Sequence, residues 1–115
     1  MTAADWEKAL WECPQAGRKL ALLAWADWLE EAGEDREAGA LRRLAAVCPG
    51  FLPNESFLRP GYYTVDRSLL VYRHRLRARL DELPNELEFD NDGKNRYYKT
   101  LLAALVAVAE ACETP

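Results

Sequence analysis

The chain has 115 residues, of which half are hydrophobic and 30% charged, and its formal net charge is −4. This length and composition are typical of one globular domain, spanning residues 1–115, and exclude a disordered chain. The small negative charge excludes a global field that would draw the whole chain to nucleic acid or to an anionic membrane.

The three cysteines, Cys13, Cys48 and Cys112, are widely spaced and odd in number. This favours reduced, buried thiols over a disulfide framework, and the zinc spacing C-x2-C is absent. The N-terminus is too polar for a signal peptide, and the uncharged run at 100–109 is about half of the roughly 20 residues that a membrane span needs. We therefore expect a cytoplasmic protein that does not enter a membrane.

The N-terminal residues predict a short helix from Ala3 to Glu12. Thr2 is available as its N-cap, and Asp5 lies in the first turn, where the helix dipole favours an acid. Trp6 and Leu10 form its apolar side.

Residues 20–44 predict two helices that meet at Ala32 and Gly33. The first runs from Ala16 to Ala32 and is apolar around most of its circumference, so we expect other elements to surround it. The second extends to about Val47, and Gly33 stands where a left-handed residue ends a helix. The expected core is Trp6, Leu20, Leu22, Trp25, Trp28, Leu29, Leu41, Leu44, Leu76, Leu80 and Leu105.

The same stretch carries a family resemblance. Residues 26–33 read A-D-W-L-E-E-A-G and are followed by Arg36 and by L-R-R-L at 41–44. Over roughly residues 18–45 the chain resembles the bacterial repeat-companion domain, whose signature is A-D-W-L-E-E-x-G. Members accompany repeats in large multi-domain proteins and also occur alone; many have a tyrosine where this chain has Trp25. The resemblance implies a helical accessory module and supplies no catalytic residue.

Residues 48–66 form the long loop of the predicted fold, because three prolines and two glycines exclude a long helix. One interpretation is a segment strapped over the helices to close the core. The other is a binding loop, since long ordered loops in small domains are often functional. Its protein-binding residues would then be Phe51, Phe57, Tyr62 and Tyr63.

A further helix is expected from Arg67 to Leu83, stopped by Pro84. It is basic up to residue 79, whereas six acids and no base follow at 81–92. The two blocks either neutralise one another or leave a basic face free for nucleic acid. The candidate nucleic-acid-binding residues are Arg67, Arg73, Arg75, Arg77 and Arg79.

The last helix is expected from Asn95 to Cys112, although a hairpin toward residues 96–98 is an alternative. Its run from Leu101 to Ala109 has no polar side. Such a helix is either enclosed by the bundle or shared with a second copy of the chain, which makes a homo-oligomer a candidate assembly.

Three patterns in the sequence bear on catalytic or metal chemistry. The acids at the end of the central helix are better explained as ion-pair partners of Arg36, Arg42 and Arg43 than as a catalytic or metal site; they are Asp27, Glu30, Glu31, Glu34 and Asp35. Arg67 and His74 resemble the Arg-x(4–6)-His element of small dimeric helical ribonucleases, but Ser68 departs from that pattern. Residues 88–93 copy half of a calcium loop, whose last ligand position holds Lys99 instead of a carboxylate.

The sequence therefore predicts an all-α fold, a compact bundle of four to five helices with one long loop rich in proline and aromatic residues. The predicted function is a non-catalytic accessory or adaptor protein that binds another protein in a bacterial multi-component system, without a cofactor. The alternative is a helical nucleic-acid-binding subunit that uses the basic residues 67–79, or a small ribonuclease.

Overall fold

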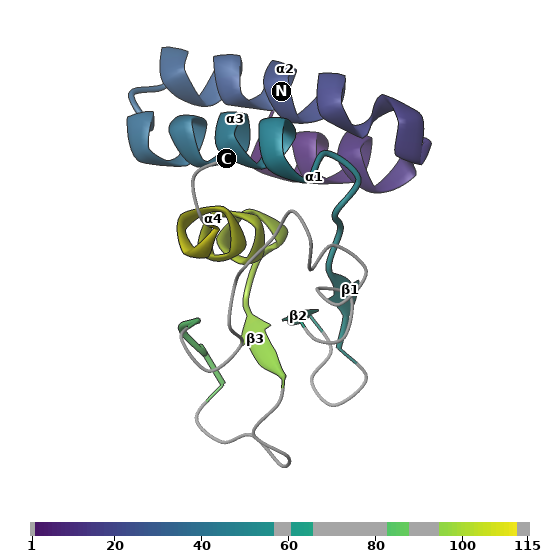
Figure 1. Cartoon of the computed structure of the whole chain (residues 1–115), viewed down its shortest axis with the longest axis vertical. Coiled ribbons are helices and arrows are strands. Elements are labelled where there is room, and N and C mark those ends of the chain that lie inside the picture. The colour runs from purple at the N-terminus through teal and green to yellow at the C-terminus, as the bar shows by residue number, and fades with distance from the viewer. Residues whose placement is uncertain (1, 57–60, 66–82, 88–94, 113–115) are drawn as a thin grey trace.

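The computed structural model describes residues 2–56, 61–65, 83–87 and 95–112. In chain order the described elements are α1 (Ala3–Glu12), a 3₁₀ turn (Gln15–Gly17), α2 (Arg18–Glu31), α3 (Asp35–Val47), β1 (Asn54–Glu55), β2 (Tyr63–Val65), β3 (Arg96–Tyr98) and α4 (Leu101–Ala111). Figure 1 shows α1, α2 and α3 in an upper layer, α4 below them and the strands below α4. The prediction of a helical fold is confirmed in part, because the fold is mostly helical but also contains a small three-stranded sheet. The predicted helix 67–83 lies outside the described residues, apart from Leu83, which is not helical.

The predicted bounds of α1 are confirmed. Its N-terminus is closed by a reciprocal pair of hydrogen bonds, in which the Thr2 amide donates to Asp5 (2.7 Å) and the Asp5 amide donates to the Thr2 hydroxyl (3.4 Å). These bonds satisfy amides that the first turn of a helix cannot pair internally. Hydrogen bonding by Thr2 also lowers the pKa of the Asp5 carboxyl.

The turn between α2 and α3 follows from Gly33, whose φ of 84° is open to glycine at little cost. The Gly33 amide donates to the Glu30 carbonyl (3.0 Å) and the Glu34 amide to the Leu29 carbonyl (2.8 Å). This is a Schellman arrangement, and it reverses the chain so that α3 packs back on α2. The predicted left-handed glycine is confirmed.

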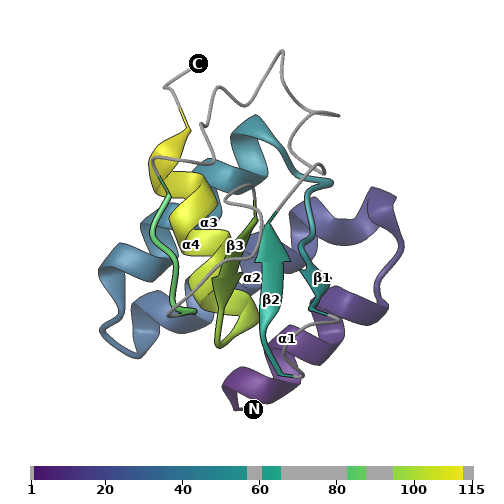
Figure 2. The same cartoon turned by 90° about the horizontal axis from the view of Figure 1, so that it is seen from below.

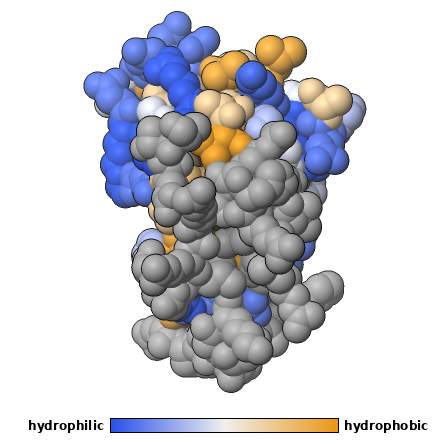
Figure 3. All heavy atoms as spheres, viewed as in Figure 1, coloured by the Kyte–Doolittle hydropathy of each residue, from blue (hydrophilic) through white to orange (hydrophobic). Residues whose placement is uncertain are grey.

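One face of α2 is buried, but the other is open. Leu22, Trp25, Ala26 and Leu29 are buried at the spacing of one helix face. Leu20 is 73% exposed, because a two-residue step turns an α-helix by about 200° and places it opposite Leu22. The prediction of Leu20 as a core residue is therefore wrong, and α2 is not enclosed on all sides. Figure 3 shows hydrophobic residues at the surface of this upper layer, between hydrophilic ones.

Most of the predicted core is confirmed where the structure describes it. Leu22, Trp25, Leu29, Leu41, Leu44 and Leu105 are buried. Trp6 and Trp28 are half-buried, and their rings lie 6.1 Å apart. Leu76 and Leu80 lie outside the described residues.

The sheet has the order β1-β2-β3, with both pairings antiparallel. Tyr63 lies opposite Tyr98 and Val65 opposite Arg96. Val65 and Tyr98 belong to the same buried cluster as the helices, so one face of the sheet packs on the helical core. The predicted loop 48–66 thus contributes two short strands.

The predicted last helix is wrong at its start, since residues 96–98 form β3 and α4 begins at Leu101. Thr100 is the N-cap and accepts a hydrogen bond from the Ala103 amide (3.0 Å). Seven of its eleven residues are buried within the one chain. Figure 1 shows why, because α4 lies between the helical layer and the sheet. The enclosed helix is therefore α4, and a second copy of the chain is not needed to bury these residues.

The three cysteines are free thiols, and Cys48 and Cys112 are buried. Burial raises the pKa of the Cys112 thiol to about 11, so the thiol is protonated at neutral pH. In the part of the chain that the structure describes, no helix has the length and apolarity to span a membrane.

Candidate functional site

The four aromatic residues predicted to bind a partner do not form one surface. Phe51, one of the predicted protein-binding residues, is fully buried and is not exposed at the surface. It belongs to the core cluster, which agrees with the interpretation of this segment as a strap. Tyr62 and Tyr63 are half-buried, and Phe57 lies outside the described residues.

The candidate nucleic-acid residues, Arg67, Arg73, Arg75, Arg77 and Arg79, all lie outside the described residues, as do His74 and the calcium-loop-like segment 88–93. Nucleic-acid binding stays a prediction. A gel shift at about 50 mM salt, where phosphate contacts are strongest, tests it, with Arg73, Arg77 and Arg79 replaced by Glu as the comparison.

Two of the acids around the α2–α3 turn, Asp27 and Glu30, form ion pairs. Arg42 donates to Asp27 (2.9 Å) and to Glu30 (2.5 Å), and these hydrogen bonds raise the pKa of its guanidinium. Arg43 instead donates to the carbonyl of Cys112. The predicted ion-pair network is confirmed for Arg42. Within the described ranges no three acidic, cysteine or histidine side chains gather as a metal site would require.

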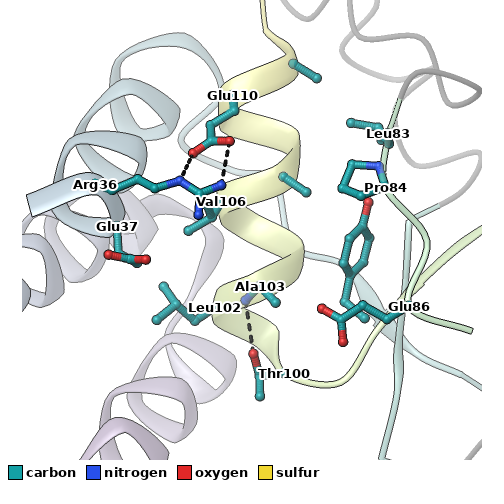
Figure 4. Close-up of a pocket in the computed structure, with 13 residues that line it drawn as sticks. Arg36, Glu37, Leu83, Pro84, Glu86, Thr100, Leu102, Ala103, Val106 and Glu110 are labelled. Carbon is teal, nitrogen blue, oxygen red and sulfur yellow. Dashed lines mark hydrogen bonds and ion pairs between the residues drawn. The ribbon is translucent and has the colours of Figure 1, made fainter. Parts of the chain in front are cut away.

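A groove of about 510 Å³ runs along α4. Figure 4 shows α4 as its floor, with α3 on one side and the segment 83–86 on the other. We call it the α4 groove, and define it by Arg36, Glu37, Leu83, Pro84, Glu86, Tyr98, Thr100, Leu102, Ala103, Val106, Ala107, Glu110 and Ala111.

The floor of the α4 groove is apolar because of the spacing along α4. Ala103, Ala107 and Ala111 recur every four residues, and Leu102 and Val106 run beside them. Residues at this spacing share one helix face. The small alanines keep that face low, so the neighbouring elements stand above it as walls.

The wall formed by residues 83–86 is attached to β3. The Glu86 amide donates to the Tyr97 carbonyl (2.9 Å), and the Tyr97 amide donates to the Asn85 side chain (3.0 Å). The Arg96 side chain also donates to the Leu83 carbonyl (3.2 Å). One backbone–backbone bond and two bonds that involve a side chain therefore hold the wall to the strand.

The rim of the α4 groove carries three carboxylates, Glu37, Glu86 and Glu110, and one guanidinium, Arg36. Arg36 binds Glu110 through two parallel hydrogen bonds of 2.6 and 2.9 Å (Figure 4). These bonds lower the pKa of Glu110 and raise that of Arg36. Both side chains are exposed, so the pair stabilises the fold only weakly. Among the described residues, the rim keeps a net negative charge.

Tyr98 also lines the groove, and its side chain is almost fully buried. Its hydroxyl has no hydrogen-bond partner among the described residues. Burial raises the pKa of this phenol well above its ordinary value, so it stays protonated. A buried hydroxyl without a partner is costly, and a ligand that offered an acceptor would remove part of that cost.

The described lining of the groove is mostly apolar and acidic. None of the described residues that line the groove is a histidine, cysteine, serine or lysine. The one aliphatic hydroxyl, on Thr100, accepts the capping bond of α4. The groove therefore offers apolar area and negative charge, without a nucleophile paired to a base.

Sequence reasoning missed this groove. The signal that could have found it is the spacing of Ala103, Ala107 and Ala111, which places three small residues on one face of the last helix. The walls give no such signal, since they come from residues far away in the chain. The chain matched no protein-family model, no curated protein and no solved structure.

Proposed function

We propose that this protein is a non-catalytic adaptor that binds a segment of another protein in the α4 groove. The observation that carries the proposal is an apolar floor bordered by acidic side chains and open at the surface. Recessed apolar surfaces with a polar rim are typical of peptide-binding sites.

The charge of the rim favours a basic partner. Glu37, Glu86 and Glu110 outnumber Arg36, and the chain as a whole carries −4. Complementary charge speeds association and selects among partners more than it adds affinity. The proposed ligand is therefore an apolar segment flanked by lysine or arginine.

The dimensions of the floor set the length of that segment. The 11 residues of α4 extend over ~16 Å at the usual helical rise. This distance accommodates about three turns of a helix or about five residues of an extended chain. A short linear segment is therefore sufficient, and a whole folded partner is not required.

The resemblance of residues 18–45 to the bacterial repeat-companion domain supports the same class of function. Such domains accompany repeats in large proteins, which is the setting in which an adaptor would act. We propose on this basis that the partner belongs to a bacterial multi-component system.

The proposal is tested by selecting binders from random peptides displayed on phage and measuring their affinities by fluorescence anisotropy. We expect the selected peptides to combine apolar and basic residues. Ala103→Trp fills the groove from its floor and should weaken binding at least about tenfold. Glu86→Lys should weaken binding about fivefold at low salt and less at high salt.

The matched control is Ala24→Trp, which places the same side chain on the exposed face of α2. This variant should bind as the wild type does. Peptides without basic residues, or peptides that bind Ala103→Trp and Ala24→Trp equally well, would contradict the proposal. A protein that self-associates through the groove would form dimers that Ala103→Trp dissociates, and that result would replace the foreign partner with a second copy.

A further inference from the structure

A second pocket, of about 240 Å³, lies between α1 and the edge of the sheet. Figure 2 shows α1 near β1 and β2 when the molecule is seen from below. The pocket is lined by Ala4, Glu7, Lys8 and Trp11 of α1, by Glu55 of β1 and by Tyr63 of β2. It is smaller than the about 300–1,000 Å³ of pockets for drug-sized ligands, and so suits a single side chain or head group.

Two aromatic rings form adjacent walls of this pocket. The ring centroids of Trp11 and Tyr63 lie 6.1 Å apart, and the planes meet at 69°. Trp11 is 43% exposed, which is unusual for the largest apolar side chain in a domain with a well-filled core. Aromatic faces carry partial negative charge, so rings at steep angles around one space attract a cation.

Two carboxylates add negative charge to the same space. Glu55 lies directly opposite Tyr63 in the strand pairing. The neighbouring pair is the hydrogen-bonded one, with the Ser56 amide donating to the Tyr62 carbonyl at 2.7 Å. Glu55 and Tyr63 therefore form a non-hydrogen-bonded pair, the type that brings side chains closest together.

Glu7 supplies the second carboxylate, from α1. Burial raises its pKa more than the amides of Leu102 and Leu101 lower it. Burial also raises the pKa of the Tyr63 phenol, and the charges of Glu7 and Glu55 raise it further. The pocket is thus partly dry and electrically negative, and Lys8 at its border is the described cation nearest to it.

We infer that the pocket formed by Trp11, Tyr63, Glu7 and Glu55 binds an alkylammonium group. Its sources are a lysine side chain of a partner protein, methylated or not, or a free quaternary ammonium compound. The rings supply cation–π attraction, and the carboxylates supply the charge that an apolar hollow lacks. This pocket is separate from the α4 groove, so the inference does not depend on the proposed function.

The first experiment compares choline with its uncharged isostere 3,3-dimethylbutanol in titrations of ¹⁵N-labelled protein. The four tryptophans give separate indole signals, and the signal that disappears in Trp11→Phe is that of Trp11. We expect choline to shift the Trp11 signal with a Kd in the low millimolar range, and the isostere to bind at least about fivefold more weakly. Equal binding of the two compounds, or no shift at Trp11, would overturn the inference.

Variants then separate the contributions. Trp11→Ala should abolish detectable binding, and Glu55→Gln should weaken it about threefold. Lys8→Ala removes a competing cation and should strengthen binding. Leu20→Ala, on the exposed face of α2, is the control and should change nothing. Choline binding that survives Trp11→Ala would overturn the assignment.

A last comparison distinguishes the two sources. N-acetyl-lysine amide and its trimethylated form are titrated beside choline. Tighter binding of a lysine derivative identifies the protein side chain as the ligand, and tighter binding of choline identifies a free ammonium compound. Failure of all three cations would overturn the inference while leaving the α4 groove untouched.

Discussion

The α2–α3 hairpin and the three-stranded sheet differ in the range of the interactions that build them. The hairpin is closed by residues 32–34, and Arg42 crosses it to reach Asp27 and Glu30, 15 and 12 residues away. The sheet joins residue 63 to residue 98 through strands of two or three residues. Local interactions leave a periodic pattern in the sequence, whereas strands this short leave almost none.

The largest expected effect is in the hairpin. Trp25 is fully buried, so Trp25→Ala should lower the free energy of unfolding by about 3–5 kcal/mol, close to the whole stability of a marginal domain. Urea denaturation followed by circular dichroism measures it. Leu20→Ala is the control and should stay within about 0.5 kcal/mol. A large cost at Leu20 would show that its face of α2 is covered in solution.

Replacing Phe51 tests whether this loop residue stabilises the core or serves only to bind a partner. Because its side chain is fully buried, Phe51→Ala should cost about 3 kcal/mol in the same denaturation experiment. A residue that only anchored a partner would cost less than about 0.5 kcal/mol in the isolated protein. A small loss of stability would therefore restore Phe51 as a candidate binding residue.

Substitutions of three glycines compare a turn in each region with a position inside a helix. Gly33 ends α2 with a φ of 84°, and Gly61 precedes β2 with a φ of 87°. Alanine at either position should cost about 1–2 kcal/mol, because a Cβ disfavours this conformation. Gly39 lies inside α3 with no atom within 4 Å of an added Cβ, so Gly39→Ala should stabilise by about 0.5–1 kcal/mol. Thermal melting measures all three, and hydrogen exchange should place the Gly61 effect mainly in the sheet.

The smallest expected effects concern Glu7 and Glu110, whose contributions to the free energy of unfolding change with pH in opposite directions. Burial raises the pKa of Glu7, so its contribution to stability is present below the unfolded pKa and is lost as the pH rises through the folded pKa. Arg36 lowers the pKa of Glu110, so that contribution is present above the unfolded pKa and is lost as the pH falls through the folded pKa.

The variants Glu7→Gln and Glu110→Gln separate these two pH dependences of stability, which urea denaturation measures from pH 3 to 7. Relative to the wild type, Glu7→Gln should gain stability as the pH rises across this range, whereas Glu110→Gln should lose it. Both changes should be fractions of 1 kcal/mol, since Glu110 is exposed and Glu7 is only half-buried, so that solvent screens both charges. Parallel pH profiles for the two variants would contradict the assigned environments.

The candidate sites show the same division as the fold. The apolar face of α4 was visible in the run from Leu101 to Ala109, but the groove exists because residues 83–86 pair with β3 beside it. Trp11 and Glu7 are one helical turn apart in α1, but the pocket between α1 and the sheet also needs Glu55 and Tyr63 from two strands. In both places half of the site comes from one helix and the other half from a distant segment.

The sequence by itself determined α1 and the α2–α3 hairpin with its left-handed Gly33. Caps, turns and helix faces depend on residues within about four positions of one another, and a linear pattern records them. Only the tertiary structure decided that Leu20 is exposed, that Phe51 is buried and that α4 rather than α2 is enclosed. Those outcomes depend on which surfaces meet across the chain. That choice follows from the total area buried when all the elements pack together, which no single stretch of sequence contains.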